Sequence, residues 1–410
     1  MLKKKAIVLG GTRPHIELIN KLKNLNFYVI LIDYLDSPIA KPYADKHIKE
    51  STLNKSAVLK IAKENSVDLV ISSCIDQANV TACYVTEKLN LPQPYSYETA
   101  LNVTDKLRMK RIMMENGIPT SLYAKIKNAQ DLSHINLRYP LIIKPVDSNS
   151  SKGVIKVENK YITDIEDIIQ KATSISRSNE AIIEEYIEGT EIGIDCFVKD
   201  GRAYVLMIKE RRKINKHNNG VQQIYGCIWP HIINDVLKGK IENIATKIAN
   251  VFNLRNCPLM IQAIINNDNI NIIEFGARIG GGESYKIIKD STGFDYVGAS
   301  IDSFLGNEIK MEYHAPIDFY ADNFIYTYPG IFKKIVLNKE YITDDILYYC
   351  KTSKTPGSNI GGDISSNNRV GCFVVKSKTL EELYTKIDVI ISNMEVYDIN
   401  DMPMMRKDIY

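Results

Sequence analysis

Short apolar runs alternate with amphipathic segments through the first hundred residues. The runs are 5–10 (KAIVLG), 27–33 (FYVILID) and 67–73 (VDLVISS), and each has the length and composition of a buried strand. An amphipathic segment at roughly 14–25 follows the first run. Strands that alternate with helices are typical of a doubly wound parallel sheet, so we predict an α/β unit here.

The first run ends in the turn GGTRPH, which lacks the GxGxxG fingerprint of dinucleotide-binding folds. The sequence therefore does not support a dinucleotide cofactor. Ligands of doubly wound sheets still bind at the carboxyl ends of the strands, which makes Arg13 and Asp33 candidate substrate contacts. A role in the turns alone explains both residues at least as well.

The pattern changes after residue 100. Residues 100–120 predict a helix that begins at a cap, Thr104 or Asp105, and ends before Gly117 and Pro119. The run PLIIKP (140–145) predicts a buried strand, the small polar residues 148–153 predict a loop, and VIKV predicts the next strand.

Two antiparallel hairpins are expected further on. Residues 181–210 predict a strand, a turn at Gly189 and a hairpin around Asp200 and Gly201. A polar loop (211–226) and a helix (about 235–252) precede a second hairpin, which turns at Asn266 to Asn269. The strand RVGCFVVK and an amphipathic helix (379–394) then predict an α+β cap at the end of the chain.

Composition narrows the class of protein. A chain of 410 residues is long enough for two or three domains, and 45% hydrophobic with 25% charged residues is usual for a soluble globular protein. The net charge of +3 is far from the basic bias of nucleic-acid binders, and no window is long enough to span a membrane. Seven scattered cysteines without a CxxC argue for reduced thiols in a cytoplasm and against structural zinc.

Lys144 ends a buried strand, where an isolated ammonium group is costly to desolvate. It either contacts an anion such as a phosphate or reaches solvent past the strand end. The loop that follows has small residues, which let backbone N–H groups approach an anion closely. An ordinary hairpin turn explains the loop equally well when it is considered alone. The loop residues are Ser148, Asn149, Ser150, Ser151, Lys152 and Gly153.

Acidic and amide side chains mark two further places. Glu184 and Glu185 are adjacent on a strand, so they point to opposite faces and one of them is expected to point inward. Gln262 and Glu274 stand on the two arms of the second hairpin and can face each other across the ladder. Their oxygen atoms suit Mg²⁺, which keeps water and nucleotide phosphates as its other ligands. Arg278 then supplies a fixed cation for a carboxylate or phosphoryl oxygen.

Taken in order, Lys106, Lys144, the loop 148–153, the segment EEYIEGTE and the ending IIEFGAR resemble the ATP-grasp superfamily of ADP-forming ligases. The likeness is greatest to the carbamoyl-phosphate-synthase-like and L-amino-acid-ligase branch. It covers about the first 310 residues and, more loosely, the rest. It implies a pre-ATP-grasp domain (1–100), a two-subdomain ATP-grasp fold (101–310, with a small lid at about 120–188) and an α+β cap (311–410).

The resemblance also implies roles for individual residues. Lys106 and Lys144 would contact the nucleotide phosphates, the loop 148–153 would cover them, and Arg278 would act at the acyl-phosphate site. Residues that would hold adenine and ribose are Glu184, Glu185, Tyr186, Ile187 and Glu191. Gln262 and Glu274 would bind Mg²⁺, with Mn²⁺ as an alternative. Arg211, in a cation-rich second lid, and the turn Gly280, Gly281, Gly282 are the expected substrate contacts.

Two positions depart from the pattern of the superfamily. The loop 148–153 is rich in serine where glycine is usual, and Gly276 replaces the asparagine of an E-x-N-x-R ending. Gly276 cannot supply a side-chain oxygen, so we expect water or a nearby residue such as Glu283 to complete the metal shell.

The activity implied by the resemblance is phosphoryl transfer from ATP to a carboxylate, followed by attack of an amine on the acyl phosphate. An amino acid or a sugar or peptide carboxylate is the expected substrate class. A bicarbonate-activating ligase and a non-catalytic ATP-binding protein are the alternatives. We expect a cytoplasmic protein that acts on small molecules, without nucleic acid or membrane, and a homodimer is compatible with the sequence.

Overall fold

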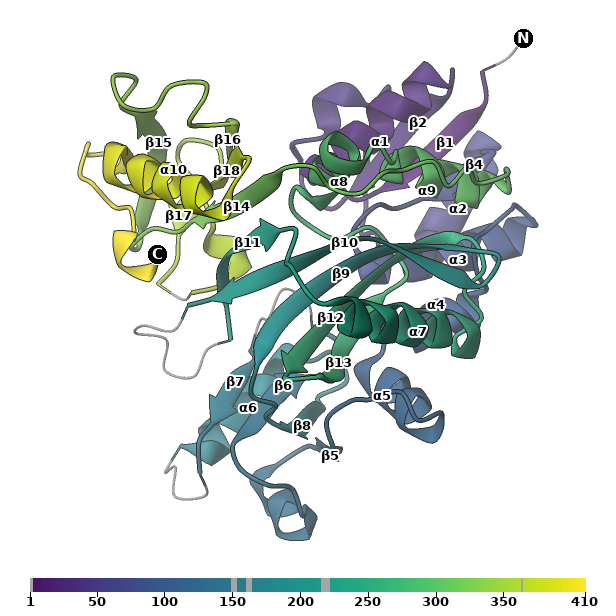
Figure 1. Ribbon diagram of the computed structural model, residues 1–410. Helices are drawn as coiled ribbons and strands as arrows, with labels where there is room; N and C mark the ends of the chain where they lie inside the picture. The colour runs from purple at the N-terminus through teal and green to yellow at the C-terminus, as the bar shows by residue number, and fades with distance from the viewer. Residues whose placement is uncertain (1–2, 149–152, 160–163, 215–221, 363) are drawn as a thin grey trace.

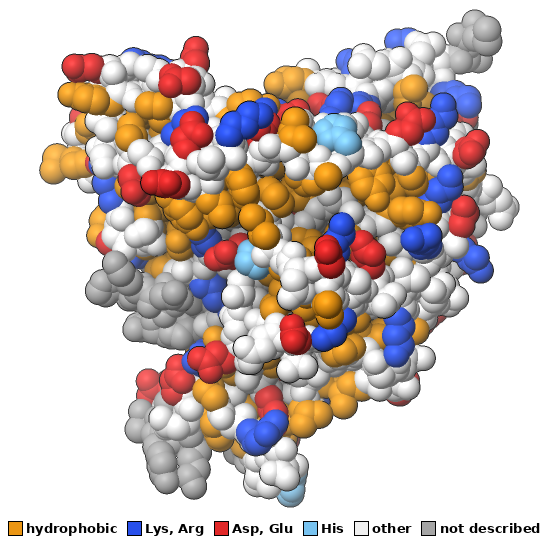
Figure 2. Space-filling view, in the orientation of Figure 1, with side chains coloured by type: hydrophobic (Ala, Val, Ile, Leu, Met, Phe, Trp, Pro, Cys, Tyr) orange, Lys and Arg blue, Asp and Glu red, His pale blue; other side chains and the backbone are white. Residues whose placement is uncertain are grey.

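The structure is a computed structural model that describes residues 3–148, 153–159, 164–214, 222–362 and 364–410 (Figure 1). Basic and acidic side chains are interspersed on the face shown in Figure 2, and neither sign gathers into one broad patch there. None of the helices among the described residues is long and apolar enough to cross a membrane.

The first domain is built on a parallel sheet, as predicted. Its four strands have the order β3-β2-β1-β4. They are β1 (Lys5–Leu9), β2 (Tyr28–Asp33), β3 (Lys46–Lys49) and β4 (Leu69–Ile71), and the helices between and after them are α1 (Arg13–Asn24), α2 (Lys55–Asn65) and α3 (Asp76–Leu89). The apolar run of β1 is buried from Ala6 to Leu9 because helices cover the sheet.

A short helical link leads to a small antiparallel sheet. The link consists of α4 (Tyr97–Asn102) and α5 (Lys106–Glu115), and the side chain of Asp105 caps α5 by accepting from two backbone N–H groups. The sheet has the order β5-β8-β6-β7. Its parts are β5 (Tyr123–Ile126), β6 (Leu141–Pro145), β7 (Ile155–Val157) and β8 (Ala181–Glu185), with α6 (Ile165–Ile175) packed against it.

A large antiparallel sheet forms the centre of the molecule, in the order β13-β12-β9-β10-β11-β14-β18-β16. Its strands are β9 (Thr190–Lys199), β10 (Arg202–Lys213), β11 (Ile224–Trp229), β12 (Cys257–Asn266), β13 (Asn269–Gly276), β14 (Phe319–Ile325), β16 (Tyr349–Thr352) and β18 (Gly371–Ser377). The accompanying helices are α7 (Asp235–Val251), α8 (Ser284–Thr292) and α9 (Tyr296–Leu305). Both predicted hairpins are present.

The prediction of a polar loop at 211–226 is wrong at both ends of that range. Arg211, Arg212 and Lys213 continue strand β10, and β11 already begins at Ile224. The two strands pair from Glu210 opposite Ile228 to Lys213 opposite Ile224. The charged residues remain in the sheet because the fold supplies partners for them, which the local sequence does not reveal. Lys216 and His217, also expected in this loop, lie outside the described residues.

The last hundred residues complete the central sheet and add a small layer beside it. Strands β14, β18 and β16 extend the large sheet, so the boundary expected near residue 310 runs through that sheet. A second sheet of β17 (Asn359–Ile360), β15 (Gly330–Leu337) and β19 (Met394–Asp398) lies next to helix α10 (Leu380–Asn393) (Figure 1). The predicted strand and helix here, β18 and α10, are confirmed in type and within a few residues in extent.

Candidate active site

One pocket collects most of the residues expected to hold a nucleotide and a metal ion. It lies between the small sheet and the β9, β12 and β13 side of the large sheet, and its walls include the aliphatic side chains of Ile142, Ile264 and Ile272. The expected residues that line it are Lys106, Lys144, Ser148, Glu184, Glu185, Tyr186, Ile187, Glu191, Gln262 and Glu274. Charged and aliphatic side chains in one pocket suit a ligand with both phosphates and a flat base.

A buried carboxylate holds two lysines at this pocket. Lys144 on β6 and Glu184 on β8 lie on neighbouring antiparallel strands, and their charged atoms are 2.7 Å apart. The Lys110 ammonium of α5 lies 3.1 Å from the same carboxylate, which also accepts a 2.8 Å hydrogen bond from Ser121. All three charged side chains are at most 6% exposed, so one anion and two cations share a water-poor site.

The charges of this triad are strongly coupled. Burial alone would raise the pKa of Glu184, but attraction to Lys110 and Lys144 outweighs it and holds the pKa at about 2. Burial lowers the pKa of Lys110 to about 8, against the attraction of Glu184. Burial acts the same way on Lys144, yet Glu184 and Glu274 raise its pKa above the usual value. Glu184 is thus the inward-pointing acid of the predicted pair, and its contact with adenine stays a prediction.

Glu185 and Glu191 point to different partners. Glu185 pairs with the exposed Arg138 at 2.9 Å, which agrees with the prediction that the two adjacent acids face opposite ways. Glu191, on β9, pairs with Arg211 at 2.6 Å and with Lys213 at 3.1 Å. Burial would raise the pKa of Glu191, but these two cations lower it. Arg211 is therefore held by Glu191 and does not line the pocket, whereas Lys213 does.

Gln262 and Glu274 face each other across the β12–β13 hairpin, as expected from the sequence. The Lys106 ammonium lies 3.8 Å from the Glu274 carboxylate and donates to the Ser148 carbonyl at 2.6 Å. An amide oxygen and a carboxylate fit Mg²⁺ or Mn²⁺, which complete their shells with water and phosphate oxygens. In the described part of the chain, no group of three His, Cys, Asp or Glu side chains offers a closed metal site.

The loop after β6 is described only at its ends. Asn149, Ser150, Ser151 and Lys152 lie outside the described residues. Gly153 has a φ of +74°, and an added β-carbon there would lie 2.8 Å from the Ile175 side chain, so the position requires glycine. Gly153 does not itself line the pocket.

Arg278 lies outside the pocket and is held by the first domain. Its guanidinium makes two 2.7 Å bonds to the Asp76 carboxylate at the start of α3. Burial would lower the pKa of Arg278, but Asp76 outweighs that effect and raises it. The predicted contact of Arg278 with an acyl phosphate stays a prediction. A ligand that reached it would meet a guanidinium that is already oriented.

The glycine turn between β13 and α8 is flanked by buried acids. An added β-carbon at Gly280 would lie 3.0 Å from Asp195, Gly281 has open space, and Gly282 has a φ of +73°. Glu283 does not face Glu274 as we expected. It is buried and accepts from Tyr349 at 2.9 Å and Lys351 at 2.7 Å. It is therefore not available to complete a metal shell at Glu274.

The two candidate contacts of the first domain have separate roles. Both carboxylate oxygens of Asp33 accept backbone N–H groups, from Gly11 at 2.8 Å and Leu35 at 2.9 Å. Asp33 is therefore a turn residue. Arg13 donates to the Thr352 carbonyl and lines a second cavity, which is described below.

Sequence reasoning missed Lys110, Lys213 and Asp76. Lys110 was open to prediction, because it follows Lys106 by one helical turn and shares its face of α5. Lys213 was assigned to a loop. No sequence pattern marks Asp76 as a site residue, because its partner Arg278 is 202 residues away in the chain.

Comparison with known proteins supports the assignment of the fold. A family model for the ATP-grasp domain matches residues 137–286. Phosphoribosylamine–glycine ligase of Lactococcus lactis is 25% identical over 296 residues, which are 68% of this chain and 70% of that protein. An L-arginine-specific L-amino acid ligase of Bacillus subtilis is 23% identical over 252 residues, which are 60% of each chain. The matches cover between 60% and 70% of the length of such curated relatives.

Likeness in three dimensions extends over the whole chain. The crystal structure of an L-amino acid ligase from Bacillus licheniformis has a TM-score of 0.83 at 19% identity, and the superposition covers 97% of this chain and 100% of that one. The fold class predicted from the sequence is therefore confirmed.

Proposed function

The chain belongs to the ATP-grasp superfamily, and we propose that it is an ADP-forming carboxylate–amine ligase that works through an acyl phosphate. The expected carboxylate substrate is an amino acid or a sugar or peptide acid. Of the relatives, one is named for joining phosphoribosylamine to glycine and another for ligating L-amino acids. Those names suggest the reaction class for this chain and leave its own substrates open.

The observation that carries the proposal is the single pocket that contains Lys106, Lys144, Gln262 and Glu274. Two ammonium groups, two side chains with metal-type oxygens and aliphatic isoleucine walls in one pocket suit a nucleoside triphosphate. Phosphoryl transfer needs positioning and charge neutralisation more than proton transfer.

Each residue then has a defined task. Lys144 would neutralise phosphate oxygens, and Glu184 would hold Lys144 in place and keep it charged. Lys106 would span the distance between the metal ligand Glu274 and the loop after β6. A divalent ion bound at Gln262 and Glu274 would polarise the phosphates. Arg278, oriented by Asp76, would bind the carboxylate that receives the phosphoryl group.

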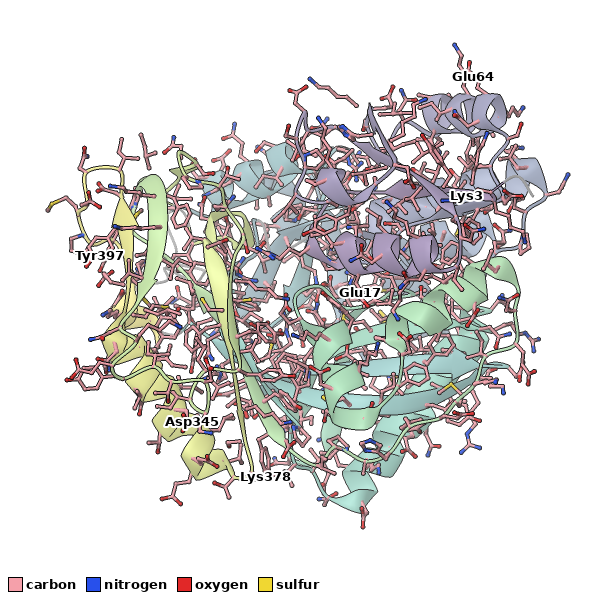
Figure 3. All side chains as sticks on the ribbon, turned by 90° about the horizontal axis from the view of Figure 1, so that it is seen from above. Lys3, Glu17, Glu64, Asp345, Lys378 and Tyr397 are labelled. Atoms are coloured by element: carbon pink, nitrogen blue, oxygen red, sulfur yellow. The ribbon has the colours of Figure 1, made fainter. Side chains whose placement is uncertain are left out.

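The proposal is tested by ADP release. The protein is incubated with ATP, Mg²⁺ and a panel of carboxylate and amine pairs, with bicarbonate alone as a separate arm. We expect ADP formation with at least one pair, and a loss of about 100-fold or more in Glu274→Gln. Glu64→Gln, on the distant helix α2 (Figure 3), is the matched control and should keep full activity.

Three outcomes would contradict the proposal. Near-normal turnover in Glu274→Gln would refute the site. ADP release that needs only bicarbonate would favour the carboxyphosphate alternative. Tight ATP binding with no turnover across the panel would favour a non-catalytic ATP-binding protein.

A further inference from the structure

A second cavity, with a volume of about 410 Å³, opens between helices α1 and α8 and is called the α1–α8 groove here. It shares no lining residue with the nucleotide pocket. Figure 3 shows Glu17 on the side of α1 that faces the green helices α8 and α9. The groove is lined by Arg13, Ile16, Glu17, Lys21, Tyr43, Tyr285, Lys286, Lys289, Asp290, Asp295, Val297 and Lys351.

The acids of the groove already have partners. Asp295 accepts from Lys21 at 2.6 Å, and Glu17 lies 3.8 Å from the same ammonium. Asp290 accepts from the hydroxyl of Tyr348 at 2.6 Å. Each of these three acids thus has a hydrogen-bond or ion-pair partner within the protein, and Glu17 and Asp295 share the single ammonium of Lys21.

Three of its cations have no such partner. Among the described residues, no carboxylate lies within 4.0 Å of the charged nitrogens of Arg13, Lys286 or Lys289, and only Lys289 is attracted at longer range, by Asp295. Arg13 uses one guanidinium nitrogen for the Thr352 carbonyl, while its buried Nε has no hydrogen-bond partner in the described structure. The Lys286 ammonium lies 3.9 Å from the centre of the Tyr349 ring, which orients it without neutralising it.

The position of the groove connects it to the proposed chemistry. Arg13 follows the end of β1, on the edge of the parallel sheet where ligands of such folds bind. Lys286 is on α8, which begins directly after the Gly280–Gly282 turn. Lys351 pairs with Glu283 at 2.7 Å, so the groove reaches the same turn from its other side.

We infer that the α1–α8 groove binds a doubly charged anionic group, a phosphate or a pair of carboxylates, on one of the two substrates. This inference rests on the proposed ligase function, because it assigns one substrate a second recognition group apart from its reacting carboxylate or amine. The guanidinium of Arg13 suits bidentate contacts to such a group, and the two lysines add point charges at the rim. Tyr43 and Tyr285 offer hydroxyl groups for the remainder of the molecule.

Binding can be measured without turnover. The full-length protein is saturated with Mg²⁺ and the imido analogue of ATP, which fills the γ-phosphate position, and is titrated calorimetrically with inorganic phosphate or malonate. We expect binding of at least one anion, weakened about 10-fold or more in Lys286→Gln and in Arg13→Gln. Lys63→Gln, an exposed lysine of α2, is the matched control and should bind as the wild type does.

The two probes distinguish the sources of charge. Binding of phosphate alone indicates a phosphorylated substrate, binding of malonate alone a dicarboxylate, and binding of both a site selective for charge only. Lack of binding for both anions, or equal affinity in all variants, would overturn the inference. Lys286→Gln decides the matter alone if Arg13→Gln does not fold. A failed ADP-release assay with intact anion binding would count against the ligase function and leave the groove assigned.

Discussion

Position 276 has glycine because the Asp76 carboxylate occupies the space of its side chain. A β-carbon there would lie 2.7 Å from Asp76 Oδ1 and 3.3 Å from Cγ of Arg278. The asparagine of the superfamily pattern and the Asp76–Arg278 pair are therefore incompatible in this arrangement. The departure seen in the sequence has a steric cause, and it places a first-domain carboxylate next to the proposed site.

Gly276→Ala tests this close packing. We expect the free energy of unfolding to fall by about 1–3 kcal/mol, because the added carbon forces Asp76 away from Arg278. Gly281→Ala is the matched control, since open space surrounds that position, and it should change stability by less than about 0.5 kcal/mol. Urea unfolding of both variants gives the comparison. In an Asp76→Ala background the cost of Gly276→Ala should largely disappear, and equal losses in both backgrounds would contradict the argument.

Asp322 on β14 gives a prediction about pH. Burial, together with the charge of Glu283, raises its pKa to about 7, and its Oδ1 has no hydrogen-bond partner among the described residues. From about pH 4 to pH 7 the folded protein therefore holds a proton that the unfolded chain has lost. The free energy of unfolding therefore falls as the pH rises from about 4 to 7. Above pH 7, the ionisation of Asp322 no longer changes it.

Asp322→Asn removes this titration. We expect the variant to gain stability over the wild type progressively from pH 4 to pH 7, reaching a few kcal/mol, on the order of 1.4 kcal/mol per pH unit. Thermal or urea unfolding at several pH values measures the difference. Asp344→Asn, at an exposed position, serves as the control and should give a curve parallel to that of the wild type. A constant difference between Asp322→Asn and wild type would refute the assignment.

At the scale of elements, sequence patterns identified strands and helices wherever the local signal was consistent. The parallel strands β1 and β2 are examples, because burial on both faces leaves unbroken apolar runs. The start of α5 is another, because Asp105 is a residue type that caps helices. Strand β3 (KHIK) was missed, since a short edge strand with polar residues carries no such signal. The type of a helix or a buried strand can be predicted from its own residues. A short edge strand forms because of the strand beside it, so its own residues do not predict it.

Strand β10 shows why a charged segment was mistaken for a loop. Its last residues are two arginines and a lysine, and their partners lie on the two strands β9 and β14. Arg211 pairs with Glu191 on β9, and Arg212 donates to Asn323 on β14 at 2.5 Å. Without those partners, burial of the guanidinium groups would be prohibitive, so local sequence alone favours a solvated loop. The candidate site was predictable where its residues follow strand ends, and not where an ion pair joins distant segments.

At the scale of the whole molecule, the large sheet joins parts that the sequence separates. Strand β11 pairs with β14, so that Gly226 lies opposite Asn323 and Trp229 opposite Tyr320. No local sequence pattern predicts this pairing. The hairpins could be predicted because their strands are consecutive in the chain, and the N-terminal parallel sheet because its strands alternate with helices. The continuation of the ATP-grasp sheet into the last hundred residues could not, since it depends on pairing across a long connection.

A chain cut after Lys310 would test how far this sheet is one unit. It would lose β14, β18 and β16, three of the eight strands, and leave β11 as an unpaired edge. Ile228 and Trp229, now at most 3% exposed, would lose part of their cover. We expect this fragment to aggregate or to unfold without a sharp thermal transition, as measured by gel filtration and circular dichroism.

The control for this cut keeps every strand. Protease cleavage in the exposed segment 353–357 breaks the chain between β16 and β17 without removing either, so the cleaved protein should stay soluble and keep a cooperative transition near that of the intact chain. The difference between the two samples then measures the contribution of the three strands rather than that of chain continuity. A soluble fragment of residues 1–310 with a sharp transition would show instead that the sheet is stable with five strands, and that the last hundred residues form a separable cap.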